Sequence, residues 1–160
     1  MDILASDRFQ ADLSDTNKAS IAIVLTYQGK YHIAFLGDAH DKDVREALVQ
    51  FFPGQAMGLV KLSHHGSSYN LSNELIDVLD TKHYILSSNR NMDMTTLARL
   101  HQKVCITKEE TVIYSNYPQP LAVRRLTEAE NKLLKIDTLN ATPQLLWKEG
   151  DAVCRIRTIL

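Results

Sequence analysis

The chain has 160 residues, of which 44% are hydrophobic and 23% charged, and its formal net charge is -1. A chain of this length and composition forms one globular domain with a sizeable core, which excludes disordered and fibrous classes. The mixed charges leave no broad cationic surface for nucleic acid, and no apolar run reaches the roughly 18 residues of a membrane span. Two cysteines outside any CxxC pair indicate a reducing compartment, so we expect a cytoplasmic protein without a membrane partner.

The first predicted elements are a polar arm, a β-hairpin and a helix. Residues 1–19 carry few apolar side chains and are expected to form a loop or arm. Two β-branched, apolar segments, 20–27 and 31–37, flank a short turn and predict a hairpin covered on both faces. The next segment begins at Asp41, a favourable N-cap residue, and its apolar side chains recur with helical spacing up to Pro53.

Strands and helices continue to alternate beyond this helix. Residues 57–63 form a short apolar strand, Ser72 can cap a second helix, 83–88 form another strand, and 95–102 form an amphipathic helix. The pattern then weakens into strand candidates at 104–106, 111–115, 121–126 and 153–159 and a helix candidate at 128–135. The order predicts an α/β (α+β) domain with a mixed β-sheet.

Three polar side chains follow the predicted strands directly. Asp38 comes after the strand at 31–37, and His64 and His65 come after the strand at 57–63. Loops at the carboxyl ends of strands commonly carry chemistry, and an aspartate with a histidine is a usual zinc ligand pair in hydrolases. Local sequence alone also fits a turn-forming aspartate and two hydrogen-bonded loop histidines.

The segments NKASIAIVLTYQGKYHIAFLGDA and LVKLSHHGSS carry a resemblance to a known family. They form an NxxS motif at Asn17 and Ser20, a GDA motif at 37–39 and a KxxHHGS motif at 61–67. In order, spacing and predicted structure, residues 17–108 resemble the C-terminal half of a metallo-β-lactamase-superfamily hydrolase, in the branch that includes DNA-uptake competence proteins.

The resemblance implies a fold and its boundaries. The half-domain, residues 20–108, would be half of a four-layer αββα sandwich, with helices packed on one face of a mixed sheet. Residues 1–19 would precede it as an arm, and 109–160 would pack on the same domain as an extension. A half-domain presents an apolar sheet face, so we expect an N-terminal half of the same fold or a second copy, as a homodimer, to cover it.

The resemblance also implies roles for individual residues. Asp38 matches the aspartate that bridges two zinc ions, and His65 matches the last histidine ligand. His64 would then face the substrate as a catalytic residue. Ser67 and Asn17 are the candidates for substrate binding.

The sequence departs from the family pattern in two places. The HxHxDH motif that supplies most of the metal ligands is absent, so two of roughly seven ligand groups are present. Relatives often carry His-Pro where Asn91 and Met92 stand here, and His40 has no counterpart and is expected to be an exposed loop residue. We therefore expect that the isolated chain binds zinc weakly and lacks hydrolytic turnover.

Two functional classes follow. The first is the C-terminal portion of a zinc-dependent hydrolase of a phosphoester or another ester, with a small-molecule or phosphoester substrate. The second is a non-catalytic interaction module derived from that fold. The chain would be a fragment of a longer hydrolase, half of a split gene or a remnant domain, and the first of these origins is favoured.

Overall fold

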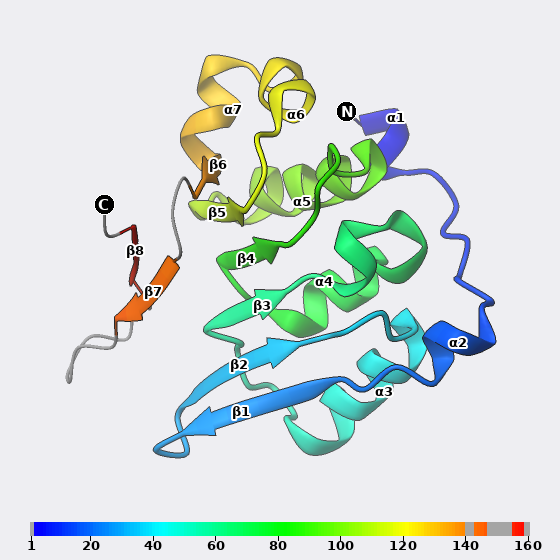
Figure 1. Cartoon of the computed structure of the whole chain (residues 1–160). Coiled ribbons are helices and arrows are strands. Elements are labelled where there is room, and N and C mark those ends of the chain that lie inside the picture. The colour runs from blue at the N-terminus through cyan, green and yellow to red at the C-terminus, as the bar shows by residue number, and fades with distance from the viewer. Residues whose placement is uncertain (1, 140–142, 147–154, 159–160) are drawn as a thin grey trace.

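A six-stranded mixed sheet organises the chain (Figure 1). The computed structural model describes residues 2–139, 143–146 and 155–158. The strands follow the order β1-β2-β3-β4-β5-β6, with β1 antiparallel to β2 and all other neighbours parallel. Their bounds are β1 Ile23–Tyr27, β2 Tyr31–Phe35, β3 Leu59–Lys61, β4 His83–Leu86, β5 Thr111–Ser115 and β6 Leu134–Thr138. The predicted α/β (α+β) class with a mixed sheet is confirmed.

Seven α-helices and a second, two-stranded sheet complete the described elements. The helices are α1 Asp2–Ala5, α2 Asp15–Lys18, α3 Asp41–Phe51, α4 Asn73–Leu79, α5 Met94–Thr107, α6 Pro120–Arg125 and α7 Glu128–Leu133. Two short 3-10 helices, η1 Ser63–Gly66 and η2 Ser68–Asn70, follow β3. The strands β7 Pro143–Leu146 and β8 Arg155–Thr158 pair antiparallel, and the rest of the strand predicted at 153–159 lies outside the described residues. Among the described residues, no helix has the length and apolar character needed to cross a membrane.

The main core lies between the sheet and the helices α3, α4 and α5, which cover one face of it (Figure 1). Strand side chains on this face, from β2 to β6, are Ala34, Val60, Tyr84, Ile113 and Leu134. They pack against helix side chains that recur at three- and four-residue spacing, among them Leu48, Leu75, Leu79, Leu97 and Leu100. Because β2 to β5 run parallel, the loops at their carboxyl ends lie along one edge of the sheet.

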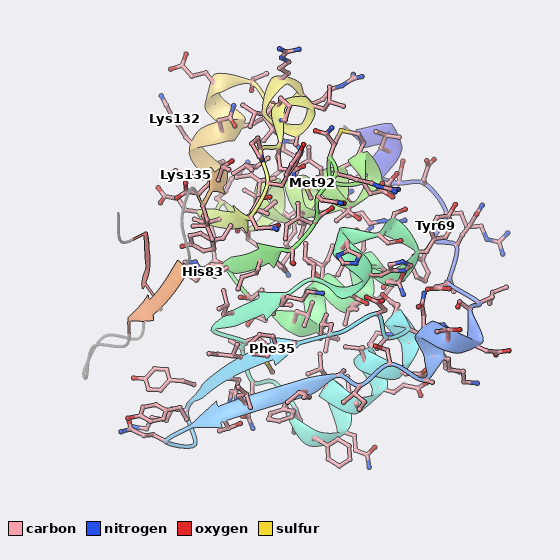
Figure 2. All side chains as sticks on the ribbon, in the orientation of Figure 1. Phe35, Tyr69, His83, Met92, Lys132 and Lys135 are labelled. Atoms are coloured by element: carbon pink, nitrogen blue, oxygen red, sulfur yellow. The ribbon has the colours of Figure 1, made fainter. Side chains whose placement is uncertain are left out.

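The sequence predicts a hairpin that is covered on both faces, but in the structure one face of it is open. On β1 the side chains of Ile23, Leu25 and Tyr27 are about half exposed, at 50%, 54% and 55%. Phe35, labelled in Figure 2, pairs with Ile23 and is also exposed. β1 is the edge strand, so only its inward-pointing side chains, such as Val24, reach the core. The apolar composition of β1 therefore marks an open face.

Two segments predicted as strands are helical. Residues 104–106 belong to α5, because Val104 continues the buried spacing of the preceding turns. Residues 121–126 lie almost entirely in α6, which begins with Pro120 at its first turn and buries Ala122, while Leu126 follows as its C-cap. The predicted helix at 128–135 ends earlier, at α7, and is followed by β6.

The start of α3 and the start of α4 are joined through a carboxylate. Asp41 is the first residue of α3 rather than its N-cap, a position that His40 occupies. The Asp41 carboxylate is buried and accepts hydrogen bonds from the Ser72 N–H at 2.6 Å and the Ser72 hydroxyl at 3.1 Å. Ser72 is the N-cap of α4, as predicted, and its hydroxyl accepts from the N–H of Leu75. This contact fixes the two helices beside the loop that carries the histidine pair.

The arm, residues 1–19, is not a simple loop. It contains α1 and α2, and Ala5 in α1 is buried. The N–H of Asp12 donates to the carbonyl of Tyr69 at 3.0 Å, which ties the arm to the segment after the histidine pair. The arm therefore contributes to the candidate site.

Candidate functional site

Three loops of the candidate site meet through backbone contacts. Gly37 has φ +57°, and a Cβ there would lie 2.6 Å from Ser20 Oγ and 2.8 Å from the Ile21 carbonyl. The next residue, Asp38, donates its N–H to Ser20 Oγ at 2.9 Å. The N–H of His64 donates to the Gly37 carbonyl at 3.0 Å. A glycine is needed at position 37 because this close approach leaves no room for a side chain.

His64 and His65 adopt a backbone conformation that is unusual for histidine. Both lie in the left-handed region, with φ 41° and 54°, and Gly66 follows with φ +79°. A Cβ on Gly66 would lie 2.8 Å from Leu86 Cδ1, so the turn passes close to β4. Backbone in this region costs about 1 to 3 kcal/mol per non-glycine residue and is concentrated at functional sites. The pair is thus held in a strained turn at the carboxyl end of β3.

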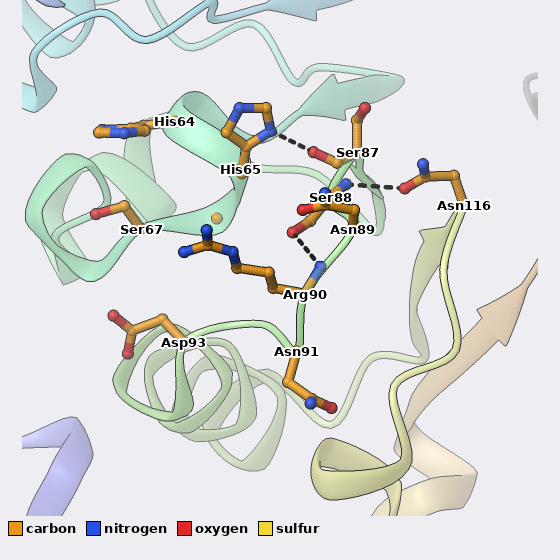
Figure 3. Close-up of a pocket in the computed structure, with 11 residues that line it drawn as sticks. His64, His65, Ser67, Ser87, Ser88, Asn89, Arg90, Asn91, Asp93 and Asn116 are labelled. Atoms are coloured by element: carbon orange, nitrogen blue, oxygen red, sulfur yellow. Dashed lines mark hydrogen bonds between the residues drawn. The ribbon is translucent and has the colours of Figure 1, made fainter.

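The hydrogen bond of His65 determines its tautomer. Its Nδ1 lies 2.6 Å from the Ser87 carbonyl oxygen, which can only accept a hydrogen bond (Figure 3). In the neutral ring Nδ1 therefore carries the proton and Nε2 has the lone pair. Metal-binding histidines are commonly oriented in this way by a backbone carbonyl. His65 is exposed, so this Nε2 is accessible to a metal ion.

The tautomer of His64 follows from Asn70. The buried Nδ2 of Asn70 lies within hydrogen-bond distance of Asp12 Oδ2 at 3.1 Å, the Asp38 carbonyl at 3.3 Å and the Ala39 carbonyl at 3.2 Å. All three are acceptors, so the amide nitrogen faces them and Asn70 Oδ1 faces His64 Nδ1 at 3.2 Å. Two acceptors, Asn70 Oδ1 and Asp12 Oδ2 at 3.5 Å, face Nδ1 of His64, against one amide donor, Asn17 Nδ2 at 3.2 Å. This surplus of acceptors favours the neutral tautomer with the proton on Nδ1, in which Nε2 is a base or acceptor.

Asp12 is the charged centre of this network. Its Oδ2 lies 3.5 Å from His64 Nδ1 and accepts from Asn17 Nδ2 at 2.7 Å. Hydrogen bonds from Asn17 and from the Ser14 N–H lower the pKa of Asp12 from 3.8 to about 2. The carboxylate is thus ionised at neutral pH, and it lies beside the Nδ1 side of the His64 ring.

We expect the Asp12 carboxylate to contribute to the acid sensitivity of the protein. Because the pKa of Asp12 is lower in the folded state, its ionised form stabilises the protein above about pH 4. This stabilisation is lost as pH falls towards about 2. Asp12→Asn should therefore reduce the loss of unfolding free energy between about pH 5 and about pH 2 by about 1 kcal/mol, after solvent screening. Urea unfolding at both pH values measures this, with exposed Asp15→Asn as the control. An equal pH dependence in Asp12→Asn and the wild type would contradict it.

Asp38 lies at the same sheet edge, but its carboxylate has a different neighbour. Lys61 is half-buried, and burial lowers the pKa of its ammonium group while the nearby Asp38 charge opposes that shift. Within the described residues, no three histidine, cysteine, aspartate or glutamate side chains are arranged to hold a metal ion. His65 fits a zinc ligand because its Nδ1 is hydrogen-bonded to the Ser87 carbonyl, whereas the described residues as a set do not fit a complete zinc site.

A polar pocket of about 680 Å³ opens beside the histidine pair (Figure 3). It is lined by His64, His65 and Ser67 and by the loops that follow β4 and β5. The Ser67 hydroxyl also accepts from the N–H of Tyr69 at 3.3 Å, as the N-cap of η2. Asn17 is not among the residues that line this pocket, because its amide contacts Asp12 and lies 3.2 Å from His64 Nδ1.

Sequence reasoning missed Asp12, Asn70 and Arg90 in this site. No motif marks them, since their partners lie on other segments of the chain. His40 also differs from its expected place in an exposed loop, because its side chain is only 16% exposed and its Nε2 donates to the Ser14 carbonyl at 3.0 Å.

The structure thus brings together the NxxS, GDA and KxxHHGS motifs at one edge of the sheet, where both histidines line the pocket. Neither a scan against protein-family models nor searches of the curated proteins and of the solved structures found a match to this chain.

Proposed function

We propose that the chain is the C-terminal portion of a zinc-dependent hydrolase of the metallo-β-lactamase superfamily, acting on a phosphoester or another ester. The observation that carries the proposal is the strained histidine turn beside the polar pocket. In it, the Ser87 carbonyl accepts from Nδ1 of His65, and Asn70 Oδ1 faces Nδ1 of His64, an arrangement that suits neutral rings with a lone pair on each Nε2. Strained backbone of this kind is concentrated at functional sites, where the surrounding structure holds it in place.

The proposal gives each histidine its own role. His65 is a metal ligand through Nε2, with its Nδ1–H held by the Ser87 carbonyl. Asp38 is the second ligand from this chain. When bound, zinc would polarise the attacked group and activate water. His64 would contact the substrate through Nε2, while Asp12 and Asn70 hold its ring in place.

The remaining ligands are proposed to come from an N-terminal half of the same fold that carries HxHxDH. This half would pack against the open face of β1 and β2, where Ile23, Leu25 and Phe35 are exposed. An apolar face of this kind is unusual on a free surface. We place the assembled protein in the cytoplasm, in keeping with two cysteines outside any CxxC pair.

The test is an assembled protein in which this chain is joined to, or co-expressed with, a half that carries HxHxDH. We expect bound zinc by elemental analysis and hydrolysis of bis(p-nitrophenyl) phosphate or p-nitrophenyl acetate. Asp38→Ala or His65→Ala should lower turnover at least about 100-fold, because each removes a metal ligand. His83→Ala, which changes a histidine outside the pocket, is the matched control.

The same assay on this chain alone should give weak zinc binding and no turnover. Turnover by the chain alone with stoichiometric zinc would contradict the divided site. Full activity of His65→Ala in the assembled protein would contradict its assignment as a ligand.

A non-catalytic interaction module is the second candidate. The exposed apolar side chains of β1 favour it, since they offer a docking surface whether or not the site is active. Light scattering on the chain alone separates the candidates when combined with the assay. A stable homodimer together with an inactive assembled protein would favour the interaction module.

A further inference from the structure

The pocket beside the histidine pair has a second wall that no motif identifies. The loop after β4, residues 87–91, and Asn116 after β5 form this wall, which meets the histidine side where the Ser87 carbonyl accepts from His65 Nδ1 (Figure 3). Among the described residues, Arg90 is the one lysine or arginine that lines the pocket. A positive charge therefore lies in a pocket whose other lining groups are mostly neutral and polar.

The backbone of Arg90 is held from both sides. Its N–H donates to Ser88 Oγ at 3.1 Å, and its carbonyl accepts from Gln119 Nε2 at 3.1 Å. Gln119 is buried, and its Oε1 accepts from the Met92 N–H at 2.7 Å. Asn116 Oδ1 accepts from the Ser88 N–H at 2.8 Å. The loop is thus fixed before any ligand binds, which lowers the entropic cost of binding.

The side chain of Arg90 is not used to hold the fold. Within the part of the chain that the structure describes, its guanidinium has no hydrogen-bond acceptor or ion-pair partner. In Figure 3 it turns back into the pocket, between His65 and Asp93 in this view. An arginine donates five N–H groups in a plane that matches the oxygens of a phosphate group.

Asp93 is the acidic residue on the same pocket, and its charge is already engaged. Its Oδ1 accepts from the Thr95 N–H at 2.8 Å, as the N-cap of α5, and its Oδ2 accepts from the Ser68 N–H at 3.2 Å. The partial positive charge of the helix N-terminus offsets part of this carboxylate. The pocket therefore retains a cationic group that is available to an anion.

We infer that Arg90 is a specificity-determining residue that binds the phosphate group of an anionic substrate in the pocket that His64 and His65 also line. The inference rests on the proposed function and goes beyond it, because it selects phosphoesters over neutral esters. The arginine binds a non-bridging phosphate oxygen, and the histidine side of the pocket faces the bond to be cleaved.

Inorganic phosphate is the probe, added to the chelator-treated chain at about pH 8, where an ordinary histidine is neutral. Backbone amide NMR signals should shift mainly at residues 64–67 and 87–91. Arg90→Gln should weaken phosphate binding at least about tenfold, since it removes a charged donor, and Arg90→Lys should weaken it less. Arg124→Gln, which removes the same charge at an exposed position on α6, should bind phosphate as the wild type does.

Equal phosphate binding by Arg90→Gln and the wild type would overturn the inference. So would the absence of shifts at residues 87–91, or an equal loss in Arg124→Gln. This result is independent of zinc and of turnover. Failure of the assembled protein to hydrolyse esters would contradict the proposed function and leave the phosphate-binding result unchanged. Likewise, failure of Arg90 to bind phosphate would overturn this inference and leave the ester-hydrolysis result unchanged.

Discussion

Replacement of a buried arginine, Arg99→Met, is expected to lower the free energy of unfolding by about 3 kcal/mol. Arg99 is only 3% exposed, and its Nη1 donates to the carbonyls of Ser68 and Leu71, each at 2.7 Å. Its guanidinium also lies over the ring of Phe9, 5.4 Å from the centroid. Methionine would fill the space but leave both carbonyls without a donor.

The charge of Arg99 is balanced by the acidic groups around it. Burial lowers the pKa of its guanidinium, and nearby carboxylates oppose the shift. These are Asp93, Asp41, Asp7 and Glu74. Removing the cation therefore also leaves these carboxylates with less compensation, which adds to the expected loss.

Urea unfolding with linear extrapolation measures the change. Exposed Arg8→Met is the control for the loss of one arginine, and it should change stability by less than about 0.5 kcal/mol. A loss below about 1 kcal/mol in Arg99→Met would contradict the role of Arg99 in holding the segment between η2 and α4.

The second large effect is expected for Asn70→Asp, an exchange of nearly equal volume. Asn70 is fully buried, and its Nδ2 faces the Asp12 carboxylate and two backbone carbonyls. The substitution removes that donor and places a second carboxyl group beside Asp12, whose pKa is about 2. We expect a loss of about 3 kcal/mol at pH 7 from repulsion and unpaired acceptors.

The loss should depend on pH. Burial and like charge raise the folded-state pKa of the introduced carboxyl, so its penalty is fully present at neutral pH and shrinks as pH falls to about 4. Urea unfolding at both pH values measures this, and Asn73→Asp, at an exposed position in α4, is the matched control. A loss that is the same at both pH values would show that repulsion by Asp12 contributes nothing.

The sequence predicted most of the elements that carry the site. Apolar and β-branched runs predicted β1 to β5, and the Ser72 cap and the leucine spacing predicted α4 and α5. The position of the polar residues followed from these elements, because a residue directly after a parallel strand must lie at the carboxyl edge of the sheet. Asp38, His64 and His65 are found at that edge.

Short segments with few apolar residues were harder to predict. Residues 121–126 are a short segment that the sequence predicts as a strand, but only Ala122 and Leu126, four residues apart, are buried. A four-residue spacing places both side chains on one face of a helix, so their burial against the core favours the helix α6 over a strand. The exposure of β1 was also missed, because an apolar strand at a sheet edge has the same composition as one covered on both faces.

The sequence by itself determined the order of the elements from β1 to the start of α5 and the loops on which the motif residues lie, because both follow from local spacing and local conformational preference. Only the tertiary structure decided the state of the histidines. Asp12 and Asn70 are 58 residues apart in the chain and meet at His64, and the tautomers depend on such contacts. Arg90 likewise lies in the pocket because Gln119 and Asn116, from another strand end, hold its loop. Hydrogen bonds between distant segments depend on packing, which no local pattern encodes.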